Sequence, residues 1–140
     1  MKKFKILFIC SYPPRQCGIA TFSQDLITSL KKSFGASMEI EVCALENESC
    51  NIADYPAEVS YRINANKVSS FFNIADKLNE REDIGMVCVQ HEFGLFGGEY
   101  GSHLVAFLLR LNIPISCVFH TVLPNPDLKR LKIIQALNDL

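Results

Sequence analysis

The first thirty residues of the chain constrain its fold more than any other segment. Residues 5–10 are almost all apolar and do not alternate with polar residues, which is typical of a parallel strand buried on both faces. The strand must end at Pro13 and Pro14, because proline fixes φ and removes a backbone donor. Apolar residues then recur at helical spacing from Ile19 to Leu30. The segment therefore predicts a strand, a loop and a helix whose N-terminal N–H groups and dipole attract phosphate.

The rest of the chain alternates between the same two patterns. Strands are expected at residues 39–45, 58–63, 86–90 and 115–119, and amphipathic helices at residues 67–82, 102–111 and from 126 onward. This alternation predicts an α/β fold, a doubly wound and mostly parallel Rossmann-like sheet with helices on both faces and the strand order 3-2-1-4-5. Such sheets bind ligands beyond the carboxyl ends of their strands. The loops at that edge begin at Ser11, His91 and His120.

The amino-acid composition and net charge limit the classes of function open to this chain. The 140 residues are 49% hydrophobic with a formal net charge of −1, which suits one domain with a sizeable core and argues against a nucleic-acid surface. The apolar runs are shorter than the roughly 18 residues of a membrane span. There are six cysteines, none in a CxxC pair, and four lie in apolar strand-like runs: Cys10, Cys43, Cys88 and Cys117. We therefore expect buried thiols in a reduced, cytoplasmic protein.

Three candidate residues lie in the first loop. Gly18 stands just before the expected helix, where a missing side chain lets the backbone approach a diphosphate, although a turn glycine is the alternative. Arg15 could pair with an anion, and Cys17 could be a reactive thiol near a helix start. A solvated arginine and a structural cysteine are the corresponding alternatives.

Two histidines end neighbouring strands of the expected sheet. His120 closes the strand at residues 115–119, where it could contact a substrate hydroxyl or a phosphate with Thr121 orienting it. His91 and Glu92 could form an acid/base pair or bind hydroxyls. A histidine bonded to a neighbouring carbonyl and a carboxylate at the rim are the alternatives.

The loop at residues 93–101 contains four glycines among aromatic residues, so it is expected to pack on a second lobe or over a ligand.

The spacing of residues excludes several other kinds of functional site. Neither GxGxxG nor GxxxxGK[ST] follows the first strand, and Leu95 stands where a metalloprotease needs a second histidine. Without paired Cys/His spacing, we expect no metal site.

Three segments resemble one known family. Residues 11–22 (SYPPRQCGIATF), 90–98 (QHEFGLFGG) and 119–123 (FHTVL) are similar to motifs of retaining glycosyltransferases of the GT-B type, in the large family 4 group. The resemblance implies that residues 1–140 are a single N-terminal, acceptor-side Rossmann-like domain. It also implies that a C-terminal nucleotide-sugar lobe is absent, so the chain alone would have little or no activity.

The same resemblance assigns roles to individual residues. Gly18 matches the position that approaches the donor diphosphate, although many relatives carry two glycines where this chain has Cys17 and Gly18. His120 matches the catalytic histidine that faces the transferred sugar, and His91 and Glu92 fall where acceptor or sugar contacts are made. The expected substrate-binding set is completed by Arg15, Cys17, Gly97, Gly98 and Thr121.

The implied reaction moves a hexose from a UDP-, GDP- or ADP-sugar to a hydroxyl of a saccharide or lipid-linked acceptor, with retention. It needs no cofactor beyond the donor and no metal, because helix N-termini and cationic side chains can stabilise the leaving diphosphate. The expected partners are the C-terminal lobe, the nucleotide sugar and the acceptor, with no nucleic acid. The expected location is the cytoplasm, peripheral to the inner membrane face.

Two alternatives of other classes remain open from the sequence. One is a stand-alone flavodoxin-like module that binds an anion or nucleotide without catalysis. The other is an interaction domain that uses residues 93–100 as a docking loop, which would also let the isolated domain self-associate.

Overall fold

A computed structural model describes residues 3–48 and 52–140. Its five strands are β1 (Phe4–Cys10), β2 (Met38–Glu46), β3 (Val59–Asn64), β4 (Ile84–His91) and β5 (Ile115–Phe119). Its helices are α1 (Gly18–Phe34), α2 (Val68–Asn79), α3 (Ser102–Arg110) and α4 (Leu128–Asn138), with short 3-10 turns η1 (Gly35–Ser37) and η2 (Glu99–Gly101). Each strand and helix lies where the hydrophobic pattern predicts it; α1 continues four residues beyond Leu30, and the other bounds differ by three residues or fewer.

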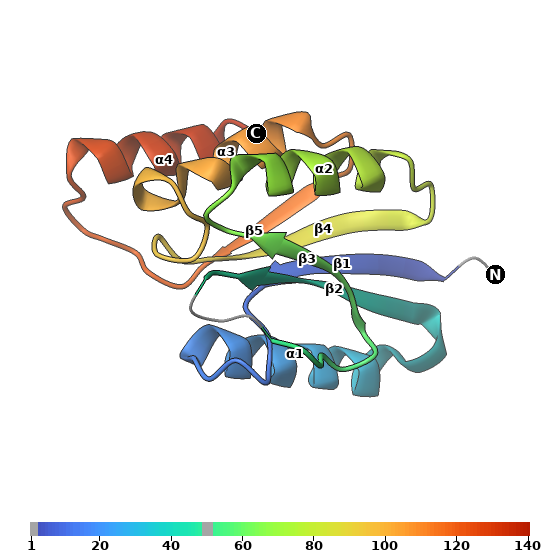
Figure 1. Ribbon diagram of the computed structural model, residues 1–140. Helices are drawn as coiled ribbons and strands as arrows, with labels where there is room; N and C mark the ends of the chain where they lie inside the picture. Colours follow the sequence, from blue (N-terminus) through green and yellow to red (C-terminus); the bar gives the residue numbers. More distant parts are fainter. Residues whose placement is uncertain (1–2, 49–51) are drawn as a thin grey trace.

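The strands form one parallel sheet in the order β3-β2-β1-β4-β5. Helix α1 covers one face of the sheet, and α2, α3 and α4 cover the other (Figure 1). The fold is therefore α/β, Rossmann-like and doubly wound, as the alternation of strands and helices predicts. Flavodoxin-like sheets have the order 2-1-3-4-5, so this chain does not share their topology.

Two hydrophobic cores explain why β1 is apolar on both faces. Leu7 and Ile9 of β1 point into the core that the sheet shares with α2, α3 and α4. Ile6 and Phe8 point into the core beneath α1, where they pack near Ile27. The side chains of a strand alternate between faces, so a strand with a core on each side needs apolar residues at every position.

The buried face of α1 differs from the expected one. The apolar spacing predicts a stripe that includes Phe22, whereas the structure buries Ala20, Ser23 and Ile27 and leaves the Phe22 ring 45% exposed. Ala20 and Ser23 have small side chains, so the first turns of α1 can lie close to the sheet. The larger Phe22 ring is left at the edge of the helix.

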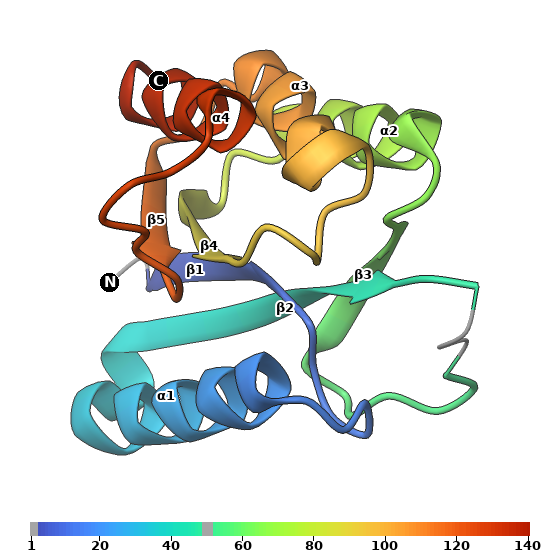
Figure 2. The same cartoon turned by 90° about the vertical axis from the view of Figure 1, so that its left-hand side faces the viewer.

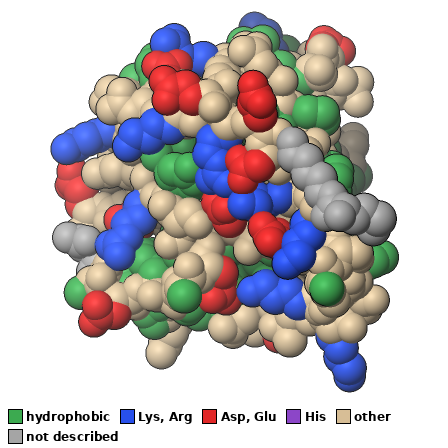
Figure 3. Space-filling view, turned by 90° about the vertical axis from the view of Figure 1, so that its right-hand side faces the viewer, with side chains coloured by type: hydrophobic (Ala, Val, Ile, Leu, Met, Phe, Trp, Pro, Cys, Tyr) green, Lys and Arg blue, Asp and Glu red, His purple; other side chains and the backbone are tan. Residues whose placement is uncertain are grey.

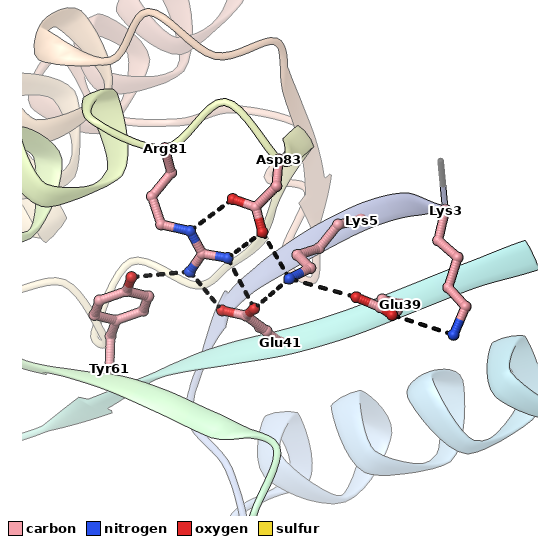
Figure 4. Close-up of polar contacts among 7 residues, drawn as sticks. All are labelled: Lys3, Lys5, Glu39, Glu41, Tyr61, Arg81 and Asp83. Carbon is pink, nitrogen blue, oxygen red and sulfur yellow. Dashed lines mark hydrogen bonds and ion pairs between the residues drawn. The ribbon is translucent and has the colours of Figure 1, made fainter. Parts of the chain in front are cut away.

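A network of charged side chains lies near the amino ends of the strands, the face shown in Figure 3. Lys5 of β1 donates to Glu41 of β2 (2.9 Å) and to Asp83 (2.7 Å), and Arg81 donates to both carboxylates and to the Tyr61 hydroxyl (Figure 4). Arg81 holds the pKa of Glu41 well below its ordinary value of 4.5, at about 2. This network ties β1, β2 and β3 to the connection before β4, and it lies at the end of the sheet opposite to the predicted ligand edge.

The five cysteines among the described residues are all free thiols. Cys10, Cys43 and Cys88 are buried, and burial raises the pKa of each thiol. The sixth, Cys50, lies outside the described residues. No helix in the described part of the chain is long and apolar enough to cross a bilayer.

Candidate functional site

The carboxyl ends of β4 and β5 bring two of the expected loops together. In the paired strands His91 lies opposite Phe119, and the backbone N–H of His120 donates to the carbonyl of His91 at 3.0 Å. Figure 2 looks onto this edge of the sheet, where the loops after β1, β4 and β5 emerge. The histidine at the end of β5 and the acidic residue after β4 are therefore neighbours.

The His120 ring is held by contacts from two elements. Its Nε2 lies 2.8 Å from Oε1 of Gln90, a residue of β4 that is completely buried. The amide nitrogen of Gln90 donates to Cys88 Sγ at 3.5 Å. On its other side the imidazole meets the edge of the Phe22 ring, with centroids 4.7 Å apart and planes at 85°. The ring of His120 is thus partly exposed but fixed between β4 and α1.

Glu92 pairs with Thr121 rather than with His91. The Thr121 hydroxyl donates to Glu92 Oε2 at 2.5 Å, and the backbone N–H of Phe93 donates to Oε1 at 2.9 Å. These bonds fix a carboxylate and a hydroxyl beside His120, at the rim of the sheet. Carboxylates and hydroxyls are suitable groups for binding a polyhydroxylated ligand.

His91 lies in the core, one residue away from this rim. Its side chain is 0% exposed, and neither ring nitrogen has a hydrogen-bond partner among the described residues. Its ring lies parallel to that of Phe96 and meets the rings of Phe93 and Phe119 edge-on, at centroid distances of 5.0–6.0 Å. Burial lowers the pKa of His91, so it is a neutral ring packed among aromatic residues. The structure does not pair it with Glu92 as an acid and base.

The three candidate residues of the first loop make different contacts. Cys17 is the N-cap of α1, because its Sγ accepts from the N–H of Ala20 at 3.4 Å. Arg15 turns toward β2 and donates to the carbonyl of Leu45 at 3.3 Å. A Cβ built at Gly18 would have no described atom within 4 Å beyond its own helix and chain neighbours. The fold itself therefore does not require glycine at position 18.

Gly97 and Gly98 are required by packing. Both have positive φ (+65° and +64°), and a Cβ at Gly97 would lie 1.6 Å from the carbonyl oxygen of Ala65, just beyond β3. A Cβ at Gly98 would lie 2.3 Å from Ser102 Oγ. The Nδ1 atom of His103 also lies 3.0 Å from the Ala65 carbonyl. These glycines let the loop cross the sheet toward β3, so they do not need a ligand to explain them.

The aromatic residues of this loop are mostly internal. Phe96 is 0% exposed and Phe93 is 9% exposed, while Arg130 of α4 stacks over the Tyr100 ring at 3.9 Å. The aromatic surface that a docking loop would need is thus turned inward.

The structure adds residues that sequence analysis missed. Gln90 is the clearest, since a buried amide at the end of an otherwise apolar strand is a signal that the sequence already contained. Next to Glu92 and Thr121 the surface is hollowed into a cavity of about 590 Å³ that Asn125, Asp127 and Arg130 also line. These three residues lie in the loop after β5 and the first turn of α4.

No protein-family model, no curated protein and no solved structure matches this chain. Within residues 3–48 and 52–140, no group of three or more His, Cys, Asp or Glu side chains could hold a metal ion. The site offers one fixed imidazole, a carboxylate paired with a hydroxyl, and the N-terminus of a 17-residue helix at which Cys17 caps the N–H of Ala20. Together these groups can bind hydroxyls and a phosphate and can stabilise charge.

Proposed function

We propose that this chain is the acceptor-side domain of a retaining glycosyltransferase, which moves a hexose from a nucleotide-diphosphate sugar to an acceptor hydroxyl. The observation that carries the proposal is the position of His120. Its partly exposed ring lies at the carboxyl end of β5, where Gln90 and Phe22 hold it at the edge to which doubly wound sheets bind ligands. Phe22 lies one turn after Gly18, so the His120 ring, which contacts Phe22, is close to the first turn of α1.

Each group at this edge has a part in the proposed reaction. The N-terminus of α1 stabilises the donor diphosphate, and the open space at Gly18 lets the phosphates approach the backbone. His120 stabilises the charge that develops near the anomeric carbon. Glu92 and Thr121 bind hydroxyl groups of the sugar or the acceptor. A second lobe supplies the remaining contacts to the nucleotide.

The first test is an NMR titration of the ¹⁵N-labelled chain, joined to a nucleotide-sugar-binding lobe, with UDP-, GDP- and ADP-glucose. We expect one of the three to shift the backbone signals of Gly18, Glu92 and His120, while signals from the charged network at the opposite end of the sheet stay unchanged. Equal small shifts over the whole surface, or no shifts with any of the three, would contradict the proposal.

The second test measures turnover after the chain is joined to a nucleotide-sugar-binding lobe. His120→Ala is expected to lower kcat by about a hundred- to a thousandfold, the usual effect of losing one group that stabilises transition-state charge. Thr28→Ala, on the exposed surface of α1, is the matched control and leaves kcat unchanged. Turnover by His120→Ala at the control's rate would remove His120 from the mechanism.

A further inference from the structure

Two cavities adjoin at the carboxyl end of β5. The first is the polar cavity of about 590 Å³ beside Glu92 and Thr121. The second, of about 340 Å³, extends under α4 and is lined by Phe93, Phe119, Thr121, Val122, Leu123, Pro126, Leu131 and Ile134. The two cavities share Phe93, Thr121, Leu123 and Pro126, so they are neighbouring parts of one depression.

The second cavity is apolar. Thr121 is the only polar residue in its lining, and the Thr121 hydroxyl is already directed to Glu92. Leu131 and Ile134 of α4 face it and are only half-buried, while Val122 at its edge is 82% exposed. A cavity of about 150 Å³ can hold benzene, so 340 Å³ holds a longer chain or a larger ring. Covering such a surface with an apolar group releases free energy in proportion to the area removed from water.

The polar cavity favours a neutral head group. Two carboxylates, Glu92 and Asp127, and one guanidinium, Arg130, line it. Arg130 lies over the rings of Tyr100 and Phe93, but its charge is compensated by the ion pair with Asp127, whereas Glu92 forms no ion pair with any described residue. A carboxylate accepts hydrogen bonds from sugar hydroxyls but repels a phosphate.

We propose that the two cavities together bind a neutral amphiphile, with a saccharide head at Glu92 and Thr121 and an apolar chain or ring against Phe119, Leu131 and Ile134. Its role as the acceptor rests on the proposed function; its binding does not. The loop that forms the wall between the cavities contains Pro124 and Pro126, so its backbone is restricted before the ligand arrives.

The experiment compares methyl, butyl, hexyl and octyl glucosides, each below its micelle-forming concentration, with the ¹⁵N-labelled chain. We expect affinity to rise by about two- to fourfold for each added methylene that enters the cavity. The backbone signals of Thr121, Val122 and Ile134 should move together. Octyl phosphate, which has the same chain and an anionic head, should bind more weakly than octyl glucoside.

Matched variants distinguish binding at this site from non-specific hydrophobic binding. Val122→Ser removes an exposed apolar side chain from the cavity edge. It is expected to lower the affinity for octyl glucoside several-fold and to change the affinity for methyl glucoside little. Leu109→Ser removes a side chain that is 70% exposed at the end of α3, outside both cavities, and should change neither affinity. Circular dichroism spectra should stay the same in both variants.

Four outcomes would overturn the proposal: affinity independent of chain length, equal loss in Leu109→Ser and Val122→Ser, tighter binding of octyl phosphate, or a dimer that Val122→Ser dissociates while no glucoside binds. The last would assign the apolar cavity to a second copy of the chain. No nucleotide sugar is present in this experiment, so it can fail while the donor titration succeeds, and the reverse.

Discussion

The buried amide of Gln90 and the imidazole of His120 form one hydrogen bond of 2.8 Å across the ends of β4 and β5. In the structure the Gln90 amide nitrogen faces the sulfur of Cys88, 3.5 Å away, and Oε1 faces His120. An amide oxygen can only accept, so in this orientation Nε2 of His120 carries the proton. This leaves Nδ1 of the neutral ring with a free lone pair.

The first prediction is that neutral His120 is found almost entirely as the Nε2–H tautomer. Gln90→Met keeps a side chain of similar length without the amide, so both tautomers should then be populated. If the proposed function is right, the same variant in the chain joined to a nucleotide-sugar-binding lobe should lower kcat by about tenfold with little change in KM, because Gln90 would position His120 without contacting the substrate. Long-range ¹H–¹⁵N NMR spectra of the ring report the tautomer directly.

The control for this prediction is in the same spectrum. The ring of His103 contacts the carbonyl of Ala65, far along the sheet from Gln90, so its signals should not change in Gln90→Met. An unchanged tautomer at His120 in that variant would show that Gln90 does not set it. A loss of stability without a change in tautomer would give Gln90 a structural role only.

The sequence predicts the sheet well because its evidence is local. Each strand is a short apolar run, each helix has its own spacing, and right-handed crossovers leave few possible orders. The face of α1 was predicted less well. Hydrophobicity alone selects Phe22, whereas the fit to the sheet selects the small side chains of Ala20 and Ser23.

The candidate site was predicted in position but not in contacts. The ends of β4 and β5 could be expected to meet, and with them Glu92 and His120. The bond between Gln90 and His120 joins residues 30 apart and depends on the register of two strands, which no local pattern fixes. The requirement for Gly97 likewise comes from Ala65, a residue that the sequence places more than 30 positions away.

The second prediction separates two glycines by substitution. Gly97→Ala should destabilise the domain by more than about 2 kcal/mol, because alanine at a positive φ is strained and its Cβ would collide with the Ala65 carbonyl. Gly18→Ala should leave stability nearly unchanged, since its Cβ would enter open space. Urea denaturation measures both.

Gly18→Ala is then the informative variant for function. If a diphosphate approaches the backbone at this position, the added methyl group should weaken nucleotide-sugar binding about tenfold in a protein of native stability. Unchanged binding would mean that the donor phosphates lie elsewhere. For Gly97, the contradicting result would be a Gly97→Ala variant as stable as wild type, since its Cβ is expected to collide with the Ala65 carbonyl.

The third prediction concerns the thiol at the start of α1. Cys17 caps the helix with a sulfur atom, a weaker acceptor than the hydroxyl oxygen that N-cap positions prefer. Cys17→Ser should therefore keep or raise stability, whereas Cys17→Ala should lower it by about 0.5–1 kcal/mol. Denaturation curves of the two variants test this directly, and an equal loss in both would mean that capping is not the role of Cys17.

The last prediction is the response of the charged network to acid. Arg81, and with it Lys5, lowers the pKa of Glu41 from 4.5 to about 2, so the folded state favours the ionised carboxylate more than the unfolded state does. That stabilisation is complete above pH 4.5 and is lost as the pH falls toward 2. Glu41→Gln should therefore cost about 1–2 kcal/mol at pH 7 and flatten the fall in stability below pH 4.5. The control is Glu39→Gln, which removes a far more exposed carboxylate from the same network and should change the pH dependence of stability much less. An equal pH dependence in the two variants would show that burial beside Arg81 is not what makes Glu41 important.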